Sequence, residues 1–217
     1  NDTINLMGFV RRENNLTDIA GNATPSHGRT ILTHQDRAQL QWRHNSGNFL
    51  NQFNIAWDRG EQSTPSVGTG PELILLNTQN PDFSEGIVSG AHFFEQGDRQ
   101  KSWTIKNDST FRMDDHTLKF GGQPAFLDLS RSVVNAFRGR YYFANPGPVA
   151  NFDFATAQPI QARINITQTP ELNAKDTQLG LYVQDEWKPD EHWTVNAGIR
   201  WDFESNANNN DYVTPAA

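Results

Sequence analysis

The sequence predicts an all-β protein, namely a portion of an antiparallel up-and-down transmembrane β-barrel with about seven strands. Three observations carry this prediction: apolar and polar residues alternate in paired segments, long stretches rich in Gly, Pro, Asn and Ser separate the pairs, and tryptophans stand at segment ends. Alternation predicts strands with one apolar face. Short periplasmic turns and longer extracellular loops are typical of outer-membrane barrels, whereas soluble domains seldom contain structureless connections longer than about 12 to 15 residues.

The clearest predicted hairpin is LGLYVQDEWKPDEHWTVNAGIRWDF, from Leu179 to Phe203, with a turn at residues 188–192. Successive residues of a strand point to opposite faces, so its second half has one apolar and one polar face. The apolar residues are Trp193, Val195, Ala197, Ile199, Trp201 and Phe203, and the others are Thr194, Asn196, Gly198, Arg200, Asp202 and Glu204. The first half sorts in the same way, except that Asp185 interrupts its apolar row near the turn. We predict that the apolar face meets lipid and that the polar face lines the lumen.

The predicted lumen-facing side chains are candidates for ligand contact, with solvated lining of the lumen as their alternative role. These candidates are Gln184, Glu186, Arg200 and Asp202. The alternation also fits a secreted, soluble β-sandwich that binds a glycan or a protein partner, because a soluble sheet turns its apolar face to a core. In that alternative, Val195, Ile199 and Trp201 would be buried.

Weaker forms of the hairpin precede it along the chain. The predicted pairs are 37–43 with 49–58 across a turn at 45–48, and 103–111 with 116–121 across a turn near Asp114 and Asp115. An opening strand near Thr3–Arg12 completes about seven strands, but its continuous apolar run leaves its faces unassigned. We predict long irregular loops at residues 59–98 and 128–176 because turn-forming residues are frequent there.

Tryptophans near the strand ends predict aromatic belts at the two membrane interfaces. The indole ring is apolar while its N–H favours a wet partner, so tryptophan prefers this position. The predicted interface residues are Trp42, Trp57, Trp187, Trp193 and Trp201. From Trp193 to Phe203 a tilted strand rises about 25 Å, which is the height of the apolar band of a barrel. Asp185 would then lie near an interface, where an acidic side chain costs little.

The composition argues against several other classes of protein. The net charge of −7 argues against a nucleic-acid partner, which favours a basic surface. The chain of 217 residues has no cysteine, which excludes disulfides and cysteine-based zinc sites. Its six histidines are scattered without the spacing of metal ligands, and its adjacent carboxylates fall in predicted turns. We therefore predict no metal, no cofactor and no enzymatic activity.

The hairpin from Leu179 to Phe203 resembles one found in TonB-dependent receptors of the Oar-like type. In that family a Tyr-Val-Gln-Asp-Glu-Trp strand precedes a short turn and a Leu-Thr-Leu-Asn-Leu-Gly-Leu-Arg-Tyr-Asp strand. Here the first strand contains YVQDEW and the second is WTVNAGIRWD, at residues 193–202. The segment HTLKFG, at residues 116–121, resembles another strand opening of the family. The two matches cover roughly a sixth of the chain.

This resemblance implies a barrel of about 22 strands with a plug domain inside it, in the bacterial outer membrane. Residues 1–217 would be part of the barrel domain, with the plug and the remaining strands outside this sequence. The implied activity is energy-coupled import of a scarce nutrient such as a siderophore, cobalamin, glycan or peptide. The implied partners are outer-membrane lipid, that nutrient ligand, and a TonB-type energy-coupling protein contacted through the N-terminal part that is missing here.

Overall fold

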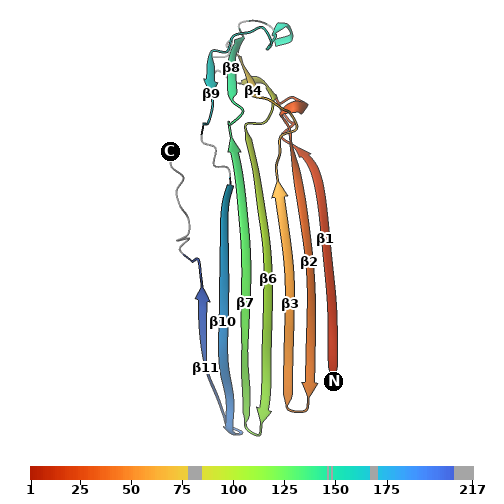
Figure 1. Cartoon of the computed structure of the whole chain (residues 1–217), viewed down its shortest axis with the longest axis vertical. Helices are drawn as coiled ribbons and strands as arrows, with labels where there is room; N and C mark the ends of the chain where they lie inside the picture. The colour runs from red at the N-terminus through yellow and green to blue at the C-terminus, as the bar shows by residue number, and fades with distance from the viewer. Residues whose placement is uncertain (78–84, 146, 148, 167–170, 208–217) are drawn as a thin grey trace.

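The computed structural model describes residues 1–77, 85–145, 147, 149–166 and 171–207. In these residues the chain forms a seven-stranded sheet, a four-stranded sheet, and the short 3-10 helices η1 (Pro25–His27) and η2 (Val149–Asn151). Figure 1 shows the long strands of the larger sheet side by side, with the smaller sheet beyond one end. The two sheets therefore divide the structure into a long wall and a compact cap.

The larger sheet confirms the prediction of an antiparallel up-and-down arrangement with about seven strands. Its order is β1-β2-β3-β6-β7-β10-β11, and every neighbouring pair is antiparallel. The strands are β1 (Asp2–Thr17), β2 (Arg29–Ser46), β3 (Phe49–Ser63), β6 (Phe94–Met113), β7 (His116–Asn135), β10 (Glu171–Asp190) and β11 (Trp193–Glu204). Within the described residues, β1 and β11 are the two edges of this sheet.

Tight turns join the three hairpins at the end opposite the smaller sheet. Gly47 and Asn48 connect β2 to β3, and Asp114 and Asp115 connect β6 to β7. Gly47 has φ +59° and Asp114 has φ +40°, which a two-residue hairpin turn requires and which glycine and aspartate tolerate. The predicted turns were therefore correctly placed, although the first is shorter than residues 45–48.

The predicted turn at residues 188–192 was too long, because β10 continues to Asp190 and only two residues separate it from β11. A register shift between Trp187 and Asp190 interrupts the alternation there, which made the strand end look like a loop. The Asp190 carboxylate accepts the backbone N–H groups of His192 at 2.8 Å and Trp193 at 3.0 Å. These two hydrogen bonds to the Asp190 side chain hold the turn between β10 and β11 closed.

The prediction of irregular structure over 59–98 and 128–176 was wrong for much of both stretches. The long strands extend well into them, and a second sheet forms from β4 (Glu72–Asn77), β5 (Glu85–Gly90), β8 (Arg140–Asn145) and β9 (Gln161–Arg163). The strand ends lack alternation because both faces are polar there, as in EQGDRQK of β6. Alternation needs one face in an apolar environment, so a strand that continues beyond the lipid loses it.

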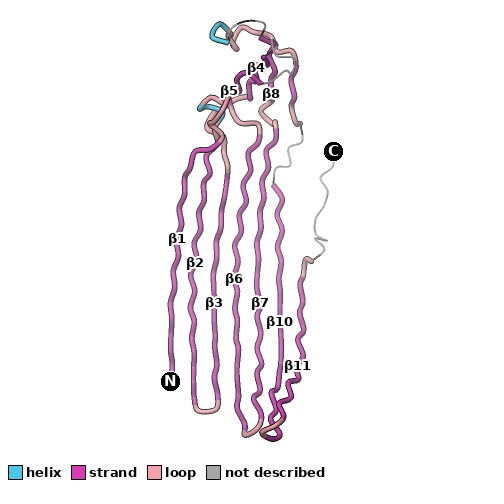
Figure 2. The backbone as a smooth tube through the Cα atoms, turned by 180° about the vertical axis from the view of Figure 1, so that it is seen from behind, coloured by secondary structure: helices cyan, strands magenta, loops and turns pink. Residues whose placement is uncertain are grey.

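The most deeply buried apolar side chains lie in the smaller sheet and in the segments that connect it to the larger sheet. Ile74 and Leu75 are 0% and 1% exposed, and Phe143 packs edge-on against Phe152 and Phe154. The larger sheet has no second sheet packed on it among the described residues, as the view from behind in Figure 2 also shows. Val195, Ile199 and Trp201 are exposed, so no described element buries them as the soluble-sandwich alternative requires.

No described helix is long and apolar enough to cross a membrane.

Candidate functional site

Strand register sorts the larger sheet into an apolar face and a polar face. One transverse row of paired residues is wholly apolar, and the row next to it on the opposite face is polar. The apolar row is Leu6, Leu40, Ile55 and Ile105, and the polar row is Asn5, Gln41, Asn54 and Lys106. The register also assigns the faces of the opening strand, which the sequence left open. In a transmembrane barrel the apolar face meets lipid and the polar face lines the lumen.

A row of charged residues marks the end of the apolar band on the side of the smaller sheet. These residues are Asp36, Arg59, Lys101, Asp128 and Lys175, each paired in register with the next. The adjacent row toward the hairpin turns contains Trp57, Trp103 and Phe126, and the two indole rings lie 6.4 Å apart. An aromatic row directly below a charged row is what a membrane interface favours.

All five tryptophans predicted to lie at the interfaces belong to the apolar face. Trp42, Trp57 and Trp201 pair in register with the apolar residues Phe53, Trp103 and Leu181, and Trp187 and Trp193 flank the last turn. The indole N–H of Trp42 donates to Asp2 at 2.9 Å, and that of Trp187 donates to Asp115 at 2.8 Å. The interface role itself stays a prediction. Trp103, which the sequence analysis did not assign to a belt, shares the row of Trp57.

The contacts of Asp185 explain how an acidic residue is placed in an apolar row. Its carboxylate lies 2.7 Å from Nδ1 of His116, whose ring stacks on the Trp187 indole with centroids 5.8 Å apart. In the adjoining turn, the hydrogen bond from Trp187 lowers the pKa of Asp115. The carboxylates at this end are therefore held by aromatic and imidazole partners close to the turns.

The four predicted lumen candidates all lie on the polar face, but the structure does not bring them into one cluster. Arg200 and Asp202 form an ion pair, with Nη2 2.7 Å from Oδ1 and Nε 2.9 Å from Oδ2. Glu186 instead pairs with Lys188 at 2.9 Å, and Gln184 lies opposite Gly198. A ligand contact for any of the four residues stays a prediction.

A bridge of three strands on the polar face was missed by the sequence analysis. The Tyr182 hydroxyl of β10 donates to Asp108 of β6 at 2.7 Å, and Lys106 lies 2.9 Å from the other carboxylate oxygen. The bridge crosses Gly121 of β7, where an added Cβ would lie 2.7 Å from the tyrosine ring and 2.8 Å from Asp108. The glycine pair 121–122 within an otherwise regular strand was the available signal, since such a glycine marks a close approach.

We predict that Gly121→Ala destabilises the barrel more than Gly122→Ala. A methyl group at Gly121 meets a backbone oxygen at 2.5 Å and the bridge itself, whereas at Gly122 its nearest contact is the flexible end of Leu181. Tyr182→Phe should cost about 1 kcal/mol through the lost hydrogen bond. Urea unfolding of the refolded protein in lipid vesicles measures all three variants. Equal destabilisation by the two glycine variants would mean that the Tyr182–Asp108 hydrogen bond does not pass closely over Gly121.

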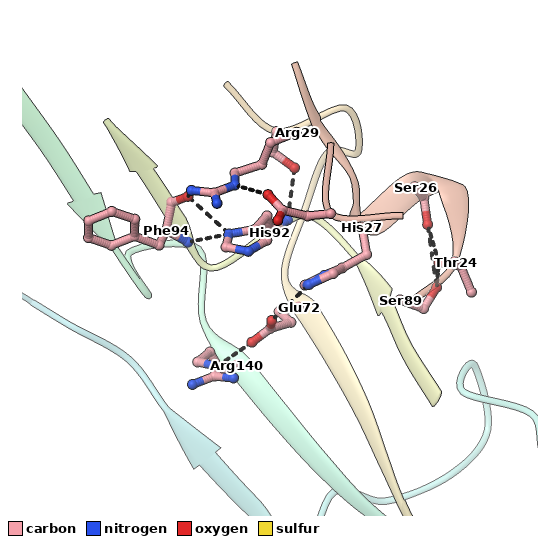
Figure 3. Close-up of polar contacts among 11 residues, drawn as sticks. Thr24, Ser26, His27, Arg29, Glu72, Ser89, His92, Phe94 and Arg140 are labelled. Carbon is pink, nitrogen blue, oxygen red and sulfur yellow. Dashed lines mark hydrogen bonds and ion pairs between the residues drawn. The ribbon is translucent and has the colours of Figure 1, made fainter. Parts of the chain in front are cut away.

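A buried polar cluster anchors the smaller sheet, and Figure 3 shows its members converging from separate elements. Glu72 of β4 is 2% exposed; its carboxylate forms an ion pair with Arg140 of β8 and lies 3.6 Å from Nε2 of His27. The rings of His27 and His92 lie in contact, with centroids 4.7 Å apart and planes tilted by 33°. Burial, together with the charges of Arg29 and His27, lowers the pKa of His92 to about 4. Neutral His92 accepts the Phe94 backbone N–H at 3.0 Å, so the cluster connects the cap to the start of β6.

The cluster shows no metal-ligand geometry. The described part of the chain contains no group of three or more His, Asp or Glu side chains that could hold a metal ion. Sequence reasoning treated the histidines as scattered, and it did not foresee that the rings of His27 and His92 are in contact. The expectation that the protein uses no metal or cofactor stays a prediction.

Comparison with known proteins agrees with the two-faced sheet. Residues 1–214 match the sequence model of the family described as outer membrane beta barrel domain. The chain belongs to this family. Its location is therefore the bacterial outer membrane, where the barrel is in contact with membrane lipid.

The barrel is similar in fold to a solved structure of the outer membrane transporter YddB from Escherichia coli. The TM-score is 0.59 and the sequence identity is 12% over 94% of this chain. The match covers 25% of the YddB chain, so this barrel segment spans about a quarter of that protein's length. No curated protein sequence matches the chain.

Proposed function

We propose that this barrel segment is part of the wall of a TonB-dependent receptor that binds a scarce nutrient and imports it with energy coupled from the inner membrane. The observation that carries the proposal is the hairpin of β10 and β11, which forms at the residues that resemble the receptors of the Oar-like type. The fold shared with an outer membrane transporter supports a role in transport.

The sheet edges support a large barrel. Open sheet edges do not occur in lipid, so β1 and β11 need further strands as neighbours. A barrel of about 22 strands has a lumen that holds a plug, and the polar face of this sheet would contact the plug and the passing nutrient. The TonB-type energy-coupling protein would act on the plug from the periplasm.

The proposed role is binding and passage without catalysis. Several charged groups on the polar face are paired with one another, as in Arg200 with Asp202 and Lys106 with Asp108. Such pairs hold their side chains in place and lack the activated nucleophile or perturbed acid–base pair that catalysis uses. We therefore assign these groups to the lining of the lumen.

The test of this function is uptake in cells that carry or lack the full-length protein. We expect growth on at least one limiting nutrient, among ferric siderophores, cobalamin, oligosaccharides and oligopeptides, to require both this protein and the TonB-type protein. A strain that lacks only the energy-coupling protein is the matched control. Uptake that needs this barrel but continues without energy coupling would overturn the proposal and indicate a passive channel.

A further inference from the structure

We propose that the polar face of β1, β2, β3 and β6 binds a neutral oligosaccharide. This inference rests on the proposed function in nutrient import and specifies the class of cargo. It is carried by a groove of about 380 Å³, which we call the amide groove. The polar residues that line it are Asn5, Gln41, Arg43, Gln52, Asn54, Lys106 and Asp108.

The carboxamides of the amide groove are brought together by register from three strands. Asn5 pairs with Gln41 and Gln41 with Asn54, so a continuous row of amides crosses from β1 to β3. Gln52 lies in the neighbouring row on the same face, opposite Arg43. Four amide groups therefore line one short stretch of the lumen wall.

Much of the hydrogen-bonding capacity of this row is unused. Asn54 accepts a hydrogen bond from Gln39 at 3.1 Å. The structure gives Asn5, Gln41 and Gln52 no side-chain hydrogen bond to any other described residue. Each carboxamide has two N–H donors and one carbonyl acceptor. The groove thus offers closely spaced donors and acceptors to a ligand that has both.

The charges near the amide groove favour a neutral ligand. The ammonium group of Lys106 lies 2.9 Å from the Asp108 carboxylate, which neutralises it. Arg37, further along β2 on the same face, is neutralised by an ion pair with Asp58. Arg43 has no ion-pair partner among the described residues and contributes further N–H donors. One cation beside four amides gives weak attraction for a multiply charged anion, whereas hydroxyl groups, which donate and accept, match the amides.

An apolar surface beside the groove favours a saccharide over other neutral polar ligands. Met7 and Phe9 of β1 lie on the same face as Asn5, because residues two apart on a strand share a face, and each is 49% exposed. Phe9 is about 13 Å along the strand from Asn5. A sugar ring has a rim of hydroxyl groups and flat C–H faces, so a short chain of sugars can contact the amides and the phenyl ring together.

The direct test is calorimetric binding of neutral hexasaccharides of glucose, mannose, galactose and N-acetylglucosamine to the full-length protein in detergent. We expect at least one to bind, and the double variant Gln41→Leu, Gln52→Leu to weaken that binding at least tenfold. The matched control is Gln178→Leu, an exposed glutamine on the polar face of β10 outside the groove, which should stay within twofold of wild type. Heat-modifiable electrophoretic mobility checks that each variant forms a barrel.

Three outcomes would overturn the proposal that the amide groove binds a saccharide: no hexasaccharide binds, a six-residue peptide or ferric siderophore binds in preference, or Gln178→Leu weakens binding as much as the groove variant. Energy-dependent uptake in cells separates this inference from the proposed function. Energy-dependent uptake of another cargo, without saccharide binding, would contradict saccharide binding in the groove but support the function as an energy-coupled receptor. Saccharide uptake that continues without energy coupling would contradict the function as an energy-coupled receptor but support saccharide binding in the groove.

Discussion

Glu72→Ala is expected to destabilise the smaller sheet by about 3 to 5 kcal/mol, because removing one partner of a buried ion pair leaves the other charge uncompensated. The Arg140 side chain is 14% exposed, and its guanidinium carbon lies 4.0 Å from the centre of the Phe93 ring. It therefore cannot move into water without leaving that packing. Loss of Glu72 also removes the neighbour of His27, so the cluster would open as a unit.

Hydrogen exchange measures this effect where it should occur. The backbone amides of Ile74 and Leu75, in the strand that carries Glu72, should lose protection at least a hundredfold, which corresponds to about 3 kcal/mol. The amide of Leu40 in the larger sheet should be unchanged. Equal loss in the two sheets would show that the cluster supports the whole barrel, and no loss would contradict the buried pair.

A matched double variant separates the ion pair from simple packing. Glu72→Leu leaves Arg140 uncompensated, whereas Glu72→Leu with Arg140→Met replaces both charges by apolar groups of similar size. Such replacement is often nearly neutral, so the double variant should be more stable than the single one. A double variant as unstable as Glu72→Leu would mean that shape, and not charge, holds the cap.

The larger sheet could be predicted because its determinants are local. Residues 193–203 alternate with period two, and the turns at Gly47 and Asp114 have local sequence signals. The strand ends beyond the charged row could not be predicted in this way, since water on both faces removes the alternation. Ile4 and Met7 show a second limit: both are apolar and alternation puts them on opposite faces, but only pairing with β2 reveals which of the two lies on the apolar face.

The smaller sheet and the bridge on the polar face depend on partners far apart in sequence. Glu72 and Arg140 are separated by 68 positions, and Tyr182 and Asp108 by 74. The parallel pairing of β4 with β8 has no turn signal, because parallel strands need a long connection. A glycine in a strand indicates that something approaches, but it does not identify the tyrosine that does so.

The last prediction concerns which face of the larger sheet meets lipid. Ile55→Arg should cost between about 1 kcal/mol, as at an interface, and about 2 to 4 kcal/mol, as at the bilayer midplane, because Ile55 lies one apolar row inside the row of Trp57, and Ala56→Arg should cost much less because it faces a polar lumen. Ile55 lies between Leu40 and Ile105, while Ala56 lies between Gln39 and Thr104, so neither position has a charged neighbour in its row. Ala197 is a poorer site, because an arginine there would lie opposite Asp185.

Stability alone cannot separate lipid from a protein core, since both reject charge, so the variants need a probe that senses lipid. The chain has no cysteine, and single cysteines at residues 53–57 can each carry a spin label in reconstituted bilayers. Labels at Phe53, Ile55 and Trp57 should contact oxygen dissolved in lipid, while labels at Asn54 and Ala56 should contact a water-soluble nickel chelate. If labels at the odd positions reached neither reagent, a protein core would cover that face. The alternation of two reagents along one strand therefore distinguishes a lipid-facing wall from a core in a way that the cost of a buried charge does not.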